Sequence, residues 1–136
     1  GTLNSSQHAG AGSAFGVVAG SASVFTMISS LIIAHLIGDF LLQNHWMQAK
    51  SRSSLVCSAH VACYSIPFVA LSVAGVLPLW ALLVILAQHW AQDRFALHLR
   101  WMALYKQTPP DKWPVGPLCM DQSWHLAFIG VVTLFC

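Results

Sequence analysis

The sequence has very little charge. Only 7% of its 136 residues are charged: six are Lys or Arg, four are Asp, and none is Glu. An ordinary soluble domain carries about 25% charged residues, so this chain has too few to cover the surface of a free-standing soluble globule. Intrinsic disorder is excluded as well, because it needs high charge and low hydrophobicity, whereas 57% of these residues are hydrophobic.

Two further classes of protein are disfavoured by what is missing. The net charge of +2 gives no basic field, and the aromatic residues lie in apolar runs rather than among Lys and Arg, so no nucleic-acid partner is expected. The cysteines at positions 57, 63, 119 and 136 form no CxxC pair, which disfavours a disulfide framework or a zinc knuckle. The class that fits is an integral membrane protein, with the lipid bilayer as its first partner.

Long apolar runs dominate what is present. A membrane helix needs about 20 mainly apolar residues, and the sequence predicts an all-α transmembrane domain over residues 24–136 with four such helices. Their expected ranges are 24–43, 54–77, 79–99 and 118–136. The polar residues 44–53 and the proline-rich residues 100–117 are expected to be loops. Pro67 lies inside the second range, where a membrane helix tolerates it with a kink.

Residues 1–23 differ from the rest because they are rich in Gly, Ala and Ser. Gly12, Gly16 and Gly20 form a GxxxGxxxG pattern, which permits close approach of a second copy or a neighbouring membrane subunit if the segment is an additional helix. A flexible linker explains the same composition. A continuous helix over residues 12–43 would be about 48 Å long, which exceeds the bilayer core of about 30 Å.

The basic residues predict the orientation. In a four-span topology the loops that follow the first and third spans lie on the same side, and all Lys and Arg residues lie in or beside those loops. The positive-inside rule therefore places both loops in the cytoplasm. We expect the membrane to be a bacterial inner membrane. These residues are Lys50, Arg52, Arg94, Arg100, Lys106 and Lys112.

Ionisable residues gather at one level of the predicted bundle. Three His–Asp pairs are spaced i, i+4, so each pair projects from one helix face, and a further His lies near the start of the second span. In an up-and-down bundle all of them come to the cytoplasmic side. Ionisable residues inside a membrane are costly and are functional candidates. The seven candidate metal ligands are His35, Asp39, His60, His89, Asp93, Asp121 and His125.

Imidazoles and carboxylates together suit divalent transition-metal ions such as Zn, Mn or Fe. Seven ligands exceed one tetrahedral shell, so the pattern predicts one or two ions, with a bridging carboxylate if there are two. Such ions generate hydroxide and hold a phosphoryl oxygen, and Asp39, Asp93 and Asp121 are the candidate catalytic residues, one of them as general base. Gln43, Gln122 and Arg94 are candidates for contacts around the ligands or with substrate.

The leading hypothesis is therefore a membrane-bound, metal-dependent hydrolase acting on a phosphoester or lipid-like substrate. Its first alternative is a non-catalytic structural or accessory subunit of a larger membrane complex, in which His–Asp pairs only tie helices together. A second alternative is a proton path, since chains of Asp and His serve pumps, although the outer halves of the spans contain no continuing relay.

Four strings carry a resemblance to a known family: HLIGDFLLQNHWMQAK (35–50), HVACYSIP (60–67), HWAQDRF (89–95) and DQSWHL (121–126). Together they resemble the domain-of-unknown-function 3307 family of small membrane proteins of bacteria and phages. Arg94 and Arg100 stand where relatives tend to continue with a Lys-bearing helix. The resemblance implies no reaction, but it implies a shared polar set: His35, Asp39, Gln43, Lys50, His60, His89, Asp93, Asp121, Gln122 and His125.

Overall fold

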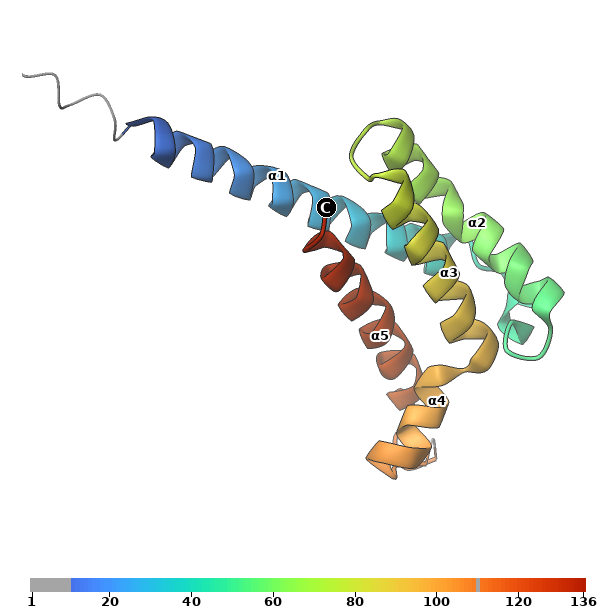
Figure 1. Ribbon diagram of the computed structural model, residues 1–136. Helices are drawn as coiled ribbons and strands as arrows, with labels where there is room; N and C mark the ends of the chain where they lie inside the picture. Colours follow the sequence, from blue (N-terminus) through green and yellow to red (C-terminus); the bar gives the residue numbers. More distant parts are fainter. Residues whose placement is uncertain (1–10, 110) are drawn as a thin grey trace, which may run out of the picture.

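The computed structural model describes residues 11–109 and 111–136, with side chains from residue 23 onward. Within these residues the chain is helical and has no strand. The long helices are α1 (Ala11–Leu36), α2 (Ser54–Val73), α3 (Leu79–Phe95) and α5 (Gly116–Thr133). The short elements are η1 (Ile37–Leu41), η2 (Trp46–Ala49), α4 (Leu97–Trp101) and η3 (Met102–Lys106). Helices α1 and α3 each contact both α2 and α5, so the four long helices close a bundle (Figure 1).

Local sequence signals set the helix ends. Ser53 has an extended backbone before α2, and its Oγ accepts a hydrogen bond from the Val56 amide at 3.4 Å, as an N-cap does. After α2, Gly75 takes a φ of +75°, which glycine adopts without steric cost. Pro78 then precedes the first turn of α3. The result is an antiparallel α2–α3 hairpin (Figure 1).

Several expected helix boundaries were wrong. The second helix ends at Val73 rather than at residue 77, the fourth covers Gly116–Thr133 rather than 118–136, and the expected loop over residues 44–53 contains η2. The third helix ends at Phe95 rather than at residue 99, because Ala96 adopts a left-handed conformation with φ 46°. The expected loop over residues 100–117 contains the end of α4 and the whole of η3, a π-helical turn. The left-handed residue redirects the chain, so that α4 packs on α5.

Two segments, Ser23–Leu41 and Ser54–Val73, are long and apolar enough to cross a membrane by length and composition. The other two expected spans are not confirmed by this criterion, since α3 has only 17 residues and the first half of α5 carries Asp121, Gln122 and His125. Large apolar side chains are exposed on the bundle surface, among them Phe25 at 73% and Leu55 at 75%. Such a surface is compatible with a membrane protein.

The glycine-rich segment continues into α1. One helix runs from Ala11 to Leu36, through Gly12, Gly16 and Gly20, and its first half extends beyond the bundle (Figure 1). The expected contact of these glycines with a second copy or a neighbouring subunit falls on residues whose surroundings the structure does not describe. At 1.5 Å per residue α1 is about 39 Å long, so it is longer than the bilayer core of about 30 Å.

The apolar core and the ionisable residues occupy successive layers of the bundle. Going along α1 and α3, the core residues come first and the His and Asp residues follow; along α2 and α5 the order is reversed. Because neighbouring helices are antiparallel, the ionisable residues meet at one end. The core consists of Leu31, Ala34, Tyr64, Phe68, Leu77, Ala81, Leu82, Ile85, Ile129 and Val132.

The end of α1 widens into a π turn next to this polar layer. The Leu42 amide donates to the Ile37 carbonyl at 3.0 Å, which is the i to i+5 bond of a π-helix. Gly38 lies against α2 there: a Cβ at this position would lie 2.6 Å from Tyr64 Cδ2 and 3.0 Å from the Tyr64 carbonyl oxygen. The close approach buries the next residue, Asp39, inside the bundle.

We expect Gly38→Ala to destabilise the fold by about 1–3 kcal/mol, because the new methyl group overpacks against backbone as well as a buried ring. Gly130→Ala is the matched control, since a Cβ there meets nothing within 4 Å and alanine favours a helix by up to about 1 kcal/mol. Thermal unfolding followed by circular dichroism in detergent should give a lower Tm for the first variant and an equal or higher Tm for the second. Equal Tm values for both variants would contradict the close Gly38–Tyr64 packing.

Candidate metal centre

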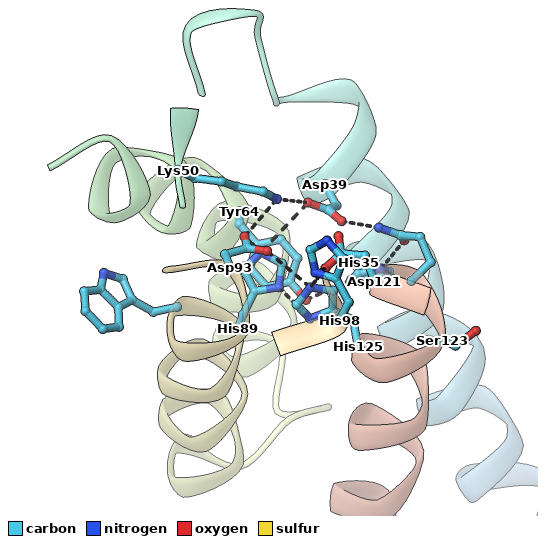
Figure 2. Close-up of polar contacts among 12 residues, drawn as sticks. His35, Asp39, Lys50, Tyr64, His89, Asp93, His98, Asp121, Ser123 and His125 are labelled. Carbon is cyan, nitrogen blue, oxygen red and sulfur yellow. Dashed lines mark hydrogen bonds and ion pairs between the residues drawn. The ribbon is translucent and has the colours of Figure 1, made fainter. Parts of the chain in front are cut away.

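The structure brings all seven predicted ligand residues into one buried cluster. Helix α1 and its π turn contribute His35 and Asp39, and α2 contributes His60. The remaining four come as i, i+4 pairs from α3 and α5. Every histidine in this set is at most 1% exposed, and every aspartate residue at most 9%. Figure 2 shows that the labelled members of this cluster point toward one another: His35, Asp39, His89, Asp93, Asp121 and His125.

Four of the ligand atoms have the spacing of a metal coordination shell. His60 Nε2 lies 3.0 Å from His89 Nε2, 3.2 Å from Asp93 Oδ2 and 3.3 Å from Asp39 Oδ1. His89 Nε2 lies 3.2 Å from Asp93 Oδ2 and 3.9 Å from Asp39 Oδ1. Around a tetrahedral ion with bonds of about 2.0–2.1 Å, neighbouring ligands are about 3.3–3.4 Å apart. We call Asp39, His60, His89 and Asp93 the four-ligand set.

A second group overlaps the first. Asp39, Asp121 and His125 each offer a ligand atom, all within 4.8 Å of one another; we call them the three-ligand set. His125 Nε2 lies 3.5 Å from Asp121 Oδ1 and 3.5 Å from Asp93 Oδ1. Asp39 belongs to both sets, and Asp93 directs one oxygen toward each. The two carboxylates therefore lie between the two sets, where bridging ligands would lie if each set held an ion.

Several buried polar atoms in the cluster lack a hydrogen-bond partner. They include both carboxylate oxygens of Asp93 and Nε2 of His125. Lys50 Nζ lies 2.8 Å from Asp93 Oδ2 as an ion pair, but without the geometry of a hydrogen bond. Buried polar groups are costly unless they are hydrogen-bonded, ion-paired or coordinated to a metal. The donor set, two imidazoles and two carboxylates at coordination spacing, therefore fits a divalent transition-metal ion.

His35 has a different position from the other three imidazoles. Its Nδ1 pairs with the Tyr64 hydroxyl at 3.0 Å, and its Nε2 pairs with Gln122 Oε1 at 2.8 Å. Because the Gln122 oxygen only accepts, Nε2 carries the hydrogen and Nδ1 accepts from Tyr64. Gln122 Nε2 in turn donates to Asp39 Oδ2. Both nitrogens are thus engaged, and His35 holds Asp39 in place through Gln122 rather than joining either set.

Lys50 is the main functional residue that the ligand pattern does not reveal. From the end of η2 its ammonium reaches Asp93 Oδ2 at 2.8 Å, Gln43 Oε1 at 3.1 Å and Asp39 Oδ1 at 3.4 Å. Burial lowers the pKa of Lys50, but the Asp93 and Asp39 carboxylates outweigh it and hold that pKa above its ordinary value. The family resemblance, which includes Lys50 in the shared polar set, is the signal that points to it.

Two further contacts come from residues outside the predicted set. The Tyr64 ring stacks on His89, with centroids 3.7 Å apart and planes 9° apart. His98 Nδ1 lies 3.0 Å from Asp121 Oδ1. No sequence signal indicated His98, because its position depends on the left-handed turn at Ala96.

Arg94 lies outside the cluster. Its Nη1 donates to the Ser51 carbonyl at 2.8 Å and its Nε donates to Ser54 Oγ at 2.9 Å. The side chain therefore ties the end of α3 to the start of α2. Of the three residues expected around the ligands, Gln122 contacts the cluster directly, Gln43 accepts a hydrogen bond from Lys50 beside it, and Arg94 does neither.

A cavity of about 420 Å³ opens beside the cluster and gives access to it. Its polar lining includes carboxylates of both ligand sets together with groups from η2 and α4. It therefore provides a route from outside the bundle to the ligand atoms. The polar residues of this lining are Asp39, Gln43, Gln48, Lys50, Ser51, Asp93, His98, Asp121 and Gln122.

The fold and the cluster define an α-helical protein with a buried His/Asp site that opens into a cavity. The chain belongs to the family described as "Protein of unknown function (DUF3307)", whose model matches residues 27–136, so the expected family is confirmed. No curated protein and no solved structure matches the chain significantly. The family assigns no reaction, and function is argued from the site.

We expect Lys50→Met to lower the free energy of unfolding by about 3 kcal/mol in the presence of a chelator, because it leaves the Asp93 carboxylate buried without its cation. The control is Lys106→Met, which removes an exposed Lys and should change stability by no more than about 0.5 kcal/mol. Unfolding by denaturant in detergent measures both. A Lys50→Met protein as stable as the control would show that the ion pair does not stabilise the metal-free fold.

Proposed function

We propose that this chain is a multi-pass membrane protein that binds one or two divalent Zn, Mn or Fe ions and acts as a metal-dependent hydrolase. The observation that carries the proposal is the set of five distances, 3.0–3.9 Å, among the atoms of the four-ligand set. This set takes the first ion. The three-ligand set offers a second and weaker position, since it has fewer ligands of its own.

The proposed topology has four spans, made by α1 with η1, α2, α3 and α5. The distribution of charge supports it: the basic residues lie near one end of the bundle, which is the end that holds the His/Asp cluster and the cavity. By the positive-inside rule this end faces the cytoplasm, and we propose a bacterial inner membrane as the location. The site then lies at the depth of the lipid headgroups.

The cavity supports a hydrolytic reaction. A bound divalent ion supplies a Lewis acid for a phosphoryl oxygen and lowers the pKa of a water molecule. Asp121 is outside the four-ligand set and lines the cavity, where it accepts the proton of the attacking water. The water oxygen forms a bond to phosphorus, the bond from phosphorus to the alcohol oxygen breaks, and Asp121 passes its proton to that oxygen. His98, next to Asp121 Oδ1, holds the carboxylate in the cavity.

The number of coordination positions that the protein leaves open at the metal distinguishes this proposal from its alternative. Four protein ligands saturate a tetrahedral Zn²⁺ ion, as in structural sites, and such a centre would suit a non-catalytic subunit of a larger membrane complex. A six-coordinate Mn or Fe ion in the same set keeps two positions open. The cavity beside Asp39 and Asp93 favours the open arrangement, since a purely structural centre needs no route of access.

Detergent-purified protein should contain one to two equivalents of Zn, Mn or Fe by plasma mass spectrometry. Asp93→Asn should lose most of this metal, because Asp93 faces both ligand sets. Asp111→Asn, which removes an exposed carboxylate, should retain it. A wild-type protein that is folded, free of metal and unable to take metal up would overturn the proposed centre, as would full metal content in Asp93→Asn.

Asp121→Asn should separate metal binding from catalysis. The variant keeps the four-ligand set, so it should retain the first ion and lower kcat toward a phosphomonoester by about 10²–10⁴-fold, the range that a general base contributes. Metal content and initial rates are measured on the same samples, with Asp111→Asn again as control. Unchanged kcat in a metal-loaded Asp121→Asn protein would exclude Asp121 as the base.

A further inference from the structure

The polar cavity adjoins an apolar groove on the outside of α1. The groove has a volume of about 440 Å³ and is lined by Ile33, Leu36, Ile37, Phe40 and Leu41. Phe40 also lines the polar cavity that holds the ligand carboxylates. The two spaces therefore adjoin each other at the Phe40 side chain, one lined by charged residues and the other by apolar residues of the outer face of α1.

The groove is a surface feature rather than part of the core. Ile33 is 57% exposed, Phe40 48% and Leu41 77%, and all three lie in the segment that is long and apolar enough to cross a membrane. The π turn places this groove beside the site, because Phe40 follows Asp39 directly within η1. An apolar chain in the groove thus ends next to the ligand carboxylates.

The cavity also offers the group that an anion needs. Lys50 is the one ammonium in its lining, and its Nζ faces Asp93, Asp39 and the Gln43 side chain. The three carboxylates of the lining outnumber this ammonium, so an anion is repelled until a divalent ion reverses the balance. Anion binding in the cavity should therefore depend on metal.

We infer that the substrate is an amphiphile with one phosphate and one apolar chain, whose phosphate enters the cavity against Lys50 while its chain lies along Ile33, Leu36 and Leu41. This inference rests on the proposed function and gives it a substrate class. Each end of the molecule meets matching chemistry: a cation and a metal position at one end, and apolar side chains at the other. Phe40 covers the junction between phosphate and chain.

The test is the binding of two non-hydrolysable phosphonates, decylphosphonate and methylphosphonate, to Mn-loaded protein in lipid nanodiscs, measured by calorimetry. Ile33→Trp fills the groove and should weaken decylphosphonate binding at least about tenfold without affecting methylphosphonate. Val69→Trp is the control, since Val69 is 43% exposed on α2 and does not line the groove. The control corrects for partition of the long chain into the bilayer.

Lys50 is tested on the same samples. Lys50→Met, measured below its unfolding temperature, should weaken both phosphonates, and Lys50→Arg should restore much of the binding. Equal affinities in Ile33→Trp and Val69→Trp, or a Lys50→Met protein that binds both probes like the wild type, would overturn the inference.

Two further measurements test the proposed function separately. They are the metal content before any phosphonate is added and the rate of hydrolysis of decyl phosphate, the ester that corresponds to decylphosphonate. Groove-dependent binding of decylphosphonate without hydrolysis would keep the binding site and exclude the hydrolase.

Discussion

The burial of three of the four aspartates inside an apolar bundle is the constraint on which the rest of this structure depends. Asp39, Asp93 and Asp121 are each at most 9% exposed, and a buried carboxylate is unstable without a cation or a hydrogen-bond donor. The bundle meets this demand from two directions. Helices α2, α3 and α5 supply imidazoles, and the loop before α2 supplies the ammonium of Lys50.

Helical periodicity explains why the sequence predicts so much of the site. An i, i+4 spacing fixes a common face, as for His89 with Asp93 and for Asp121 with His125, and antiparallel packing fixes a common level. Neither property depends on loop conformation. Helix ends were less predictable, because they depend on single residues. Alanine is not a residue type that indicates a left-handed conformation, yet Ala96 adopts one and ends α3. The resulting turn brings His98 to Asp121.

His35 shows why the spacing of residues in the sequence does not reveal which histidines have a nitrogen free for a metal. In the sequence it forms the same i, i+4 pair with Asp39 as His89 forms with Asp93 and His125 forms with Asp121. In the fold, the Tyr64 hydroxyl and the Gln122 amide engage both of its nitrogens, so it positions Asp39 through Gln122 and offers no free nitrogen to a metal. That distinction arises from neighbours 29 and 87 residues away in the chain, which no local spacing contains.

Lys50 joins the stability of the site to its proposed chemistry. Its Nζ lies 2.8–3.4 Å from Asp93, Asp39 and His60, so it packs against one face of the four-ligand set. An ammonium and a divalent ion repel each other at such separations. In the proposed site, a bound metal ion would therefore favour movement of Lys50 outward into the cavity, where an anion would meet it. Under that proposal, the residue that neutralises the metal-free site would become available to substrate when the metal takes over that role.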